Sequence, residues 1–240
     1  ISDGGLSANR PRISQSTRDS PLVFALLALT FSTGLIDAVS YIGLGRVFVA
    51  NMTGNVVLLG FAAAGIPGLS VTRSLLSLIG FLLGAAAGGR LETVLAGKNR
   101  RKWLLSVGAV ETALILAAAL VSFGFDIDGA APPDRLYAMI VLTGKAMGLR
   151  NATVRSLRVP DLTTTVLTLT LTGLAADSPL PGGNSPRPAR RILSVVVLFA
   201  GAAAGAFLLR YGLALPLFVT AACVLGTSAA YALARSNENE

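Results

Sequence analysis

The chain has 240 residues, of which 53% are hydrophobic and 13% are charged, and its net charge is +8; its mean hydropathy is +0.69. Soluble domains carry about a quarter charged residues, so this composition excludes a soluble enzyme domain, and the basic charge on so apolar a chain indicates cytoplasmic loops of a membrane protein rather than a nucleic-acid partner. Histidine is absent and there is one cysteine, which excludes an internal disulfide and a zinc cluster and removes the commonest general base, so we expect no metal, no cofactor and no enzymatic activity.

Both ends of the sequence are polar. Residues 1–20 include Arg10, Arg12 and Arg18, and this segment is too long and too polar for the start of a signal peptide. No small-residue cleavage site follows the first apolar stretch. We therefore expect residues 1–20 to form a cytoplasmic N-terminal tail and residues 235–240 a cytoplasmic C-terminal tail.

Six apolar stretches are long enough to cross a membrane, which takes about 20 residues of helix. They lie at residues 21–43, 71–93, 103–124, 135–157, 190–211 and 213–234. Two further stretches, at 53–66 and 162–176, would cover only about 20 Å as helices. The sequence therefore predicts an all-α polytopic membrane protein with six transmembrane helices and two short helices.

The basic residues decide how the two short stretches run. If all eight stretches crossed, the loop that holds Lys98 to Lys102 would lie opposite the basic N-terminus. If the short stretches enter and leave on one side, most basic residues gather on one face and the acidic loop 126–134 on the other. The positive-inside tendency favours the second arrangement. We expect six crossings, two re-entrant segments and both termini in the cytoplasm.

The sequence contains an internal repeat, with residues 21–125 as the first half and 135–234 as the second. Residues 34–38 match 148–152, residues 60–63 match 173–176, and the run 76–88 matches 193–205. The order is kept, with offsets of 114, 113 and 117 residues. Each half holds an odd number of predicted crossings, so we expect two inverted-topology repeats, as in many secondary transporters.

The two short stretches begin with amide and hydroxyl side chains. The first turn of a helix has unpaired N–H groups and a partial positive charge, and it can hold an anion or a carboxylate. Two such ends that enter from opposite faces would meet near the midplane, where repeat-built transporters bind substrate. We therefore predict a substrate site there, the alternative being helix capping alone. Its predicted residues are Asn51, Thr53, Asn55, Asn151, Thr163, Thr164, Thr165 and Thr168.

Three charged residues lie within predicted crossings. Asp37 occupies the repeat position of Asn151, and an intramembrane carboxylate is by default a functional hypothesis, here the coupling of a proton or Na⁺. The alternative for Asp37 is a structural hydrogen bond. Glu111 and Lys145 both fall about 12–18 Å deep at the usual helical rise. We expect them to form a buried charge pair with a structural role.

Glycines recur every four residues in equivalent stretches, at Gly80, Gly84 and Gly88 and at Gly201 and Gly205. Small residues at this spacing let helices pack closely in lipid. We expect packing seams rather than binding sites. The same seams would also allow a homodimer.

Two motifs carry a family resemblance. The first half contains GLIDAVSY (34–41) and FVANMTGN (48–55), and the second contains GLRNA (148–152) and VPDLTTTVLT (159–168). In these motifs the chain resembles the YoaK-like family of bacterial integral membrane proteins, a domain of unknown function (1275), over roughly residues 20–234. The resemblance implies a multi-pass protein of the bacterial cytoplasmic (inner) membrane with about six crossings. It brings no established substrate, cofactor or catalytic residue.

These features favour a small transporter of a solute that the sequence does not identify, with a weak preference for a small anion or carboxylate. A channel built on the same paired re-entrant segments is one alternative. A non-transporting membrane receptor or assembly scaffold is the other. The expected partners are the lipid bilayer and a small-molecule or ion solute.

Overall fold

The computed structural model describes residues 20–97, 99–157, 167–178 and 188–234. Apart from an isolated bridge between Asp126 and Ala131, these residues form helices, turns and loops, which confirms the predicted all-α class. The long helices are α2 (Ser20–Ala38), α4 (Val71–Leu91), α5 (Arg100–Val121), α6 (Pro133–Leu157), α8 (Pro188–Leu208) and α9 (Ala214–Ala234). The short ones are α3 (Met52–Ala63) and α7 (Leu167–Ala176), and single turns η1 (Val39–Gly43), η2 (Glu92–Ala96) and η3 (Leu209–Tyr211) extend α2, α4 and α8.

Five helices in the described part of the chain are long and apolar enough to cross a membrane: α2, α4, α5, α8 and α9 with their extensions. Six were expected. The difference is α6, which has 25 residues but carries five charged side chains, so its sequence is less apolar than that of its neighbours. Much of α6 is buried against other helices, and a helix so placed needs less lipid-facing apolar surface.

The helices pack in a pattern that pairs the two halves of the chain. α4 lies along α6 and α2 along α8, while α5 packs on both α6 and α9, and α9 also packs on α2. Each short helix lies on the long helix that follows it, α3 on α4 and α7 on α8. By the sequence repeat, α2 corresponds to α6, α3 to α7, α4 to α8 and α5 to α9. Exchanging the two helices of each of these pairs leaves the pattern of contacts unchanged.

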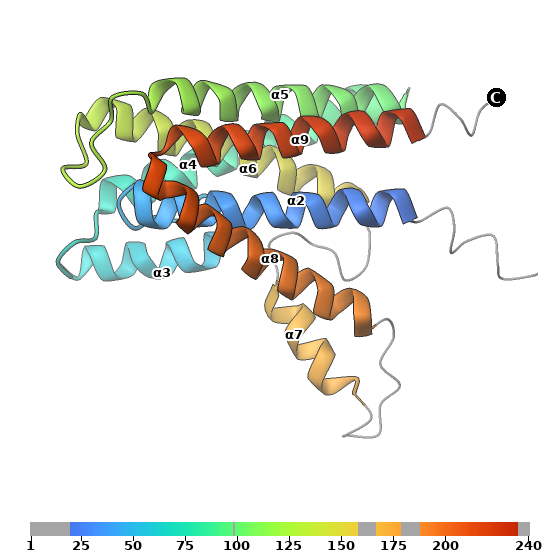
Figure 1. Cartoon of the computed structure of the whole chain (residues 1–240), viewed down its shortest axis with the longest axis horizontal. Coiled ribbons are helices and arrows are strands. Elements are labelled where there is room, and N and C mark those ends of the chain that lie inside the picture. Colours follow the sequence, from blue (N-terminus) through green and yellow to red (C-terminus); the bar gives the residue numbers. More distant parts are fainter. Residues whose placement is uncertain (1–19, 98, 158–166, 179–187, 235–240) are drawn as a thin grey trace, which may run out of the picture.

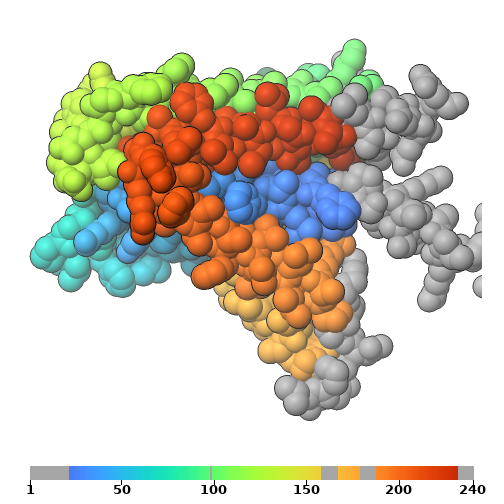
Figure 2. All heavy atoms as spheres, in the orientation of Figure 1, coloured from blue at the N-terminus to red at the C-terminus, as the bar shows by residue number. Residues whose placement is uncertain are grey.

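The two ends of the bundle differ in their charged residues (Figure 1). One end, here called the basic end, carries the start of α5 with Arg100, Arg101 and Lys102, and the last turn of α9. The other, the acidic end, carries the loop between α5 and α6 with Asp126 and Asp128. The end that carries this loop also carries Arg46, Arg73, Arg135 and Arg210. α3 lies toward the acidic end, and α7 with the adjoining part of α8 projects from the bundle nearer the basic end (Figures 1 and 2).

Large apolar side chains are exposed on the outside of the bundle. Phe24 is 70% exposed, Phe199 74% and Leu169 72%, and similar residues occur on every long helix. A surface of this kind is expected of a chain that lies in lipid. The largest buried apolar cluster lies in the half nearer the acidic end, and it includes Ile36, Val39, Ile115, Met139, Ile140 and Leu217. Smaller clusters around Leu26 and Trp103 lie nearer the basic end.

The predicted glycine seams pack helices of one chain against each other. A Cβ atom built on Gly84 would collide with the backbone of Lys145 in α6, and one built on Gly201 would collide with that of Phe31 in α2. Close backbone approach of this type requires the missing side chain. These glycines therefore meet other helices of the same chain, and the predicted homodimer stays a prediction.

Candidate functional site

The α-helix that contains Asp37 ends at Ala38, and the π-helical turn η1 continues it to Gly43. From there the chain passes into a loop that contains Gly45 and Arg46, both with positive φ, and α3 begins at Met52. One oxygen of the Asp37 carboxylate, Oδ1, is buried and has no hydrogen-bond partner among the described residues, while the backbone amide of Ala50 in this loop lies close to the carboxylate. The predicted coupling group therefore lies near the end of α2, inside the bundle.

The amide side chains around this loop are used by the fold. Asn51 caps α3 by accepting a hydrogen bond from the Gly54 N–H at 3.2 Å. Asn55 is 1% exposed; its Oδ1 accepts from the Phe48 N–H at 3.4 Å, and its Nδ2 donates to the Ser74 carbonyl at 3.0 Å. These bonds attach the loop to α4, so Asn51 and Asn55 have structural partners already. Thr53 is exposed at the start of α3.

The second set of predicted substrate residues lies mostly elsewhere. Thr163, Thr164 and Thr165 are outside the described residues. Thr168 is exposed on α7, a helix tied to α8 by an ion pair of 2.7 Å between Arg191 and Asp177. The described residues therefore do not bring the beginnings of the two short helices together as one site, and the predicted meeting at the midplane stays a prediction.

Glu111 pairs with Arg150, not with Lys145 as predicted. The guanidinium of Arg150 places Nε 2.6 Å and Nη2 2.5 Å from Glu111 Oε1, and both side chains are almost fully buried. Arg150 and Lys145 stand five residues apart on α6, about 140° around the helix, so they face different neighbours. The Lys145 backbone lies against Gly84 of α4, whereas Arg150 points toward α2 and α5.

Arg150 also binds α2. Its Nη1 donates to the Leu29 carbonyl at 3.1 Å and to the Thr33 hydroxyl at 3.0 Å. Asp37 stands one turn beyond Thr33 on the same face of α2, about 6 Å along it, and its carboxylate interacts electrostatically with Arg150. Glu111, Arg150 and Thr33 therefore form a connected row of polar groups across α5, α6 and α2, and Asp37 lies one turn beyond its end.

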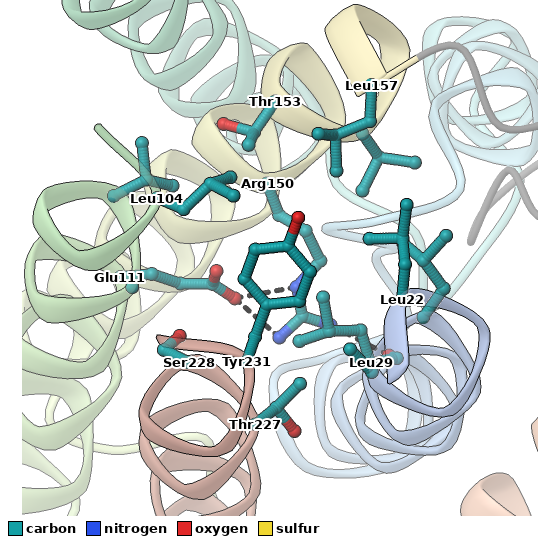
Figure 3. Close-up of a pocket in the computed structure, with 15 residues that line it drawn as sticks. Leu22, Leu29, Leu104, Glu111, Arg150, Thr153, Leu157, Thr227, Ser228 and Tyr231 are labelled. Atoms are coloured by element: carbon teal, nitrogen blue, oxygen red, sulfur yellow. Dashed lines mark hydrogen bonds and ion pairs between the residues drawn. The ribbon is translucent and has the colours of Figure 1, made fainter. Parts of the chain in front are cut away.

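A cavity of about 60 Å³ ends on this row (Figure 3). It lies between α2, α5, α6 and α9, and it extends from Leu22, Leu157 and Tyr231, near the basic end, inward to Glu111 and Arg150. Its walls are mainly aliphatic, and Thr153, Thr227 and Ser228 add hydroxyl groups. By volume it holds roughly four water molecules.

Neither Thr33 nor Arg150 was predicted from the sequence as a partner of Glu111. Thr33 is one of several hydroxyl residues in an apolar helix, and nothing local separates it from those that bond only their own helix. Arg150 had a signal, since it replaces Ile36 in the repeat, and a cation within a crossing needs a buried partner. Asn151 donates to the Met147 carbonyl of its own helix at 2.8 Å.

Among the described residues, no group of three or more His, Cys, Asp or Glu side chains is placed to hold a metal ion. The polar groups here are the planar guanidinium of Arg150, the carboxylates of Glu111 and Asp37, and nearby hydroxyl groups, and they lie inside the bundle. Such a set binds and orients a charged solute, and it can exchange protons.

The comparisons with known proteins identify the family. Residues 25–230 match the family model described as "Protein of unknown function (DUF1275)". The chain is also 34% identical over 155 residues to the UPF0700 transmembrane protein YoaK of Bacillus subtilis (strain 168), a match that covers 65% of each chain. No solved structure matches the chain. This protein, a multi-pass membrane protein, therefore belongs to the DUF1275 family, whose function is unknown.

Proposed function

We propose that this chain is a small secondary transporter whose two halves are inverted repeats and whose solute site is the cavity that ends on Glu111 and Arg150. In the membrane, α6 is the sixth crossing, α3 and α7 are re-entrant, and the basic end faces the cytoplasm. The cluster of Arg100, Arg101 and Lys102 at the basic end supports this orientation, while Arg46, Arg73, Arg135 and Arg210 at the other end count against it.

Contacts between the halves support the repeat. A Cβ built on Gly34 would lie 2.6 Å from the Ala202 nitrogen, and one built on Gly148 would lie 2.8 Å from the Ala85 nitrogen. The glycines differ by 114 residues and the alanines by 117, the offsets of the sequence repeat. Gly88 and Gly205 meet Ala152 and Ala38 in the same way. The halves thus contact each other through equivalent atoms.

The observation that carries the proposal is an asymmetry between equivalent positions. α2 and α6 contribute eight residues to the cavity at the basic end, and their counterparts at an offset of 114 are all buried in the half nearer the acidic end. The cavity residues are Leu22, Ala25, Leu26, Leu29, Arg150, Thr153, Val154 and Leu157. The counterparts are Leu136, Met139, Ile140, Thr143, Ile36, Val39, Ser40 and Gly43.

In two halves of like structure, one set of positions lines a cavity and the equivalent set is packed in the core, which would allow a second arrangement with these roles exchanged. Exchanging the packing of the halves would close the cavity at the basic end and open its counterpart at the acidic end, which is alternating access around a fixed site. Asp37, one turn beyond Thr33 on α2, serves as the coupling group. A channel is disfavoured, because the packed core beyond Arg150 blocks a continuous path.

The test is thiol accessibility at one equivalent pair, Thr153 and Val39, on a Cys223→Ser background. Vesicles of either orientation are treated with a membrane-impermeant maleimide. We expect Thr153→Cys to react from the basic side and Val39→Cys to react slowly from the other side. In the double variant, modification of the thiol at position 153 should prevent the reaction of the thiol at position 39, because the two openings exclude each other. Asp128→Cys and Arg101→Cys report vesicle orientation.

The same experiment separates the alternatives. Independent reaction at both positions would indicate a continuous path and hence a channel. Complete protection of the thiol at position 39 under every condition would indicate a static protein and contradict transport. Only mutually exclusive reaction from opposite sides fits the proposed mechanism.

A further inference from the structure

The Nε and Nη2 groups of the Arg150 guanidinium are only partly used by contacts within the protein. Arginine binds a carboxylate best when two parallel N–H groups meet two oxygens. Here the Nε and Nη2 groups of Arg150 both contact a single oxygen, Glu111 Oε1, and Nη2 makes this contact without an aligned hydrogen bond. The guanidinium edge that faces Glu111 is therefore incompletely satisfied by the protein's own groups.

The charges that line the cavity limit what can bind there. Of the described residues around it, Arg150 is the one cation and Glu111 the one anion. A ligand with two or more negative charges would meet one positive group and a repelling carboxylate. A ligand with one negative charge can pair with the two parallel N–H groups of Arg150, provided that the Glu111 carboxylate moves away from them.

Burial then links the ligand to a proton. If the ligand takes Arg150, Glu111 is left as a buried carboxylate without a counterion, which is strongly unfavourable. Uptake of one proton by Glu111 restores neutrality. In this step the Arg150–Glu111 ion pair breaks, the ligand carboxylate forms two hydrogen bonds to Nε and Nη2, and Glu111 becomes a carboxylic acid with a proton from water.

The aliphatic walls of the cavity determine which group can be attached to the carboxylate of the ligand. Leu22, Leu26, Leu29, Leu104 and Val107 surround the space next to the ion pair, and a cavity of about 60 Å³ accommodates only a short chain.

We infer that this cavity binds a short-chain aliphatic monocarboxylate together with one proton, with Arg150 as the carboxylate ligand and Glu111 as the proton acceptor. The inference rests on the proposed function only in that it names the class of solute.

Other ionisable groups lie near Glu111 and Arg150. α6 contributes Arg150 and Lys145, and α9 contributes Tyr231 in the cavity wall and Cys223, which interacts electrostatically with Arg150. On α2, Asp37 interacts with the same guanidinium. Glu92 of η2 is hydrogen-bonded to Ser156. Asp37 is thus the competing proton acceptor, and a variant must separate it from Glu111.

The experiment is equilibrium binding to the purified full-length chain in lipid nanodiscs, followed by the fluorescence of Trp103. This is the single tryptophan, it is buried against Val107 and Leu149, and Val107 lines the cavity. The probes are acetate, butyrate and laurate, with butyramide, butylammonium and 2-aminobutyrate as charge controls. We expect butyrate to bind, and its affinity to fall about tenfold for each unit of rising pH.

Chain length separates a soluble acid from a membrane fatty acid. Affinity should rise from acetate to butyrate by about fourfold per methylene and then stop rising, because the cavity is short. If the affinity continued to rise with chain length as far as laurate, the site would be assigned to fatty acids of the bilayer, and the short-chain assignment would be overturned. Equal binding of butyramide, or tighter, pH-independent binding of 2-aminobutyrate, would overturn the carboxylate–proton assignment.

Variants assign the groups. Arg150→Lys should weaken butyrate binding at least tenfold, since it keeps the charge and loses the fork, while Arg155→Gln, an exposed site on the same helix, should not change it. Glu111→Gln should bind with an affinity independent of pH, and Asp37→Asn should keep the wild-type pH dependence. The reverse result would assign the proton to Asp37 and overturn the role of Glu111.

A second measurement does not depend on the folding of any variant. Butyrate added to wild-type protein in weak buffer should be accompanied by the uptake of one proton per bound carboxylate, and the absence of uptake would overturn the inference. Binding with no mutually exclusive reaction of the thiols at positions 153 and 39 would refute transport but not the ligand. If the thiols at positions 153 and 39 reacted in a mutually exclusive way but no carboxylate bound, the ligand assignment would be refuted but transport would not.

Discussion

At the scale of single residues, the fold depends on a few buried polar contacts that connect distant parts of the chain. Arg150 joins α6 to α2 and α5 through Leu29, Thr33 and Glu111. Asn55 joins the loop after α2 to α4. In lipid or in a protein interior these contacts have no water to replace them, so removal of one partner leaves the other unsatisfied.

Arg150→Met should destabilise the protein by about 3–5 kcal/mol at neutral pH, because Glu111 would remain buried without its cation. Adding Glu111→Gln to this variant should recover most of the loss, since it removes the stranded charge. The free energy of unfolding, measured in mixed micelles by denaturant titration, checks both values. A double variant less stable than Arg150→Met alone would contradict the pairing of these two residues.

Asn55→Ala should destabilise by about 1–3 kcal/mol, because the Phe48 N–H and the Ser74 carbonyl would lose a buried partner. Thr53→Ala, on the exposed face of the same short helix, is the matched control and should stay within about 0.5 kcal/mol of wild type. The same unfolding titration gives the comparison. If Thr53→Ala were the more damaging change, Asn55 would not be the anchor of the loop.

At the scale of helices, the glycine contacts determine how closely the halves approach. Each of the two major seams, α2 with α8 and α4 with α6, has glycines on both helices at equivalent positions. Backbone meets backbone there, so an added methyl group cannot be absorbed by a side-chain rotation.

Gly34→Ala and Gly148→Ala should each destabilise by about 1–3 kcal/mol, and by similar amounts, because each added Cβ meets the neighbouring backbone. Gly226→Ala in α9 is the control, since nothing lies within 4 Å of its added Cβ. Alanine is the better helix former, so this control should be neutral or stabilising by up to about 1 kcal/mol. Thermal unfolding of the three variants gives the ranking, and a destabilised control would contradict it.

At the scale of the whole molecule, the two halves form one bundle, and the cavity that ends on Glu111 and Arg150 lies toward its basic end. Equivalent helices make equivalent contacts, yet the cavity has a packed counterpart. At one equivalent pair, Arg150 lines the cavity and Ile36 is buried in the core.

The orientation of the whole molecule is tested by single cysteines on the Cys223→Ser background. Ala64→Cys, at the exposed end of α3, and Asp128→Cys should react with an impermeant reagent from the same side of the membrane. Arg101→Cys should react only from the opposite side. Reaction of the Ala64 variant from the Arg101 side would mean that α3 crosses the membrane, and the halves would no longer be inverted.

The sequence by itself determined the membrane class, the positions of the long and short helices, the repeat and the glycine seams. These follow from hydropathy over about 20 residues and from spacing along one helix, and both are local properties. Only the tertiary structure decided that Glu111 meets Arg150 instead of Lys145, and that Asn55 holds a loop instead of facing a solute. Those outcomes depend on the rotation of each helix about its axis and on the neighbours it meets, and a distance along the chain does not encode them.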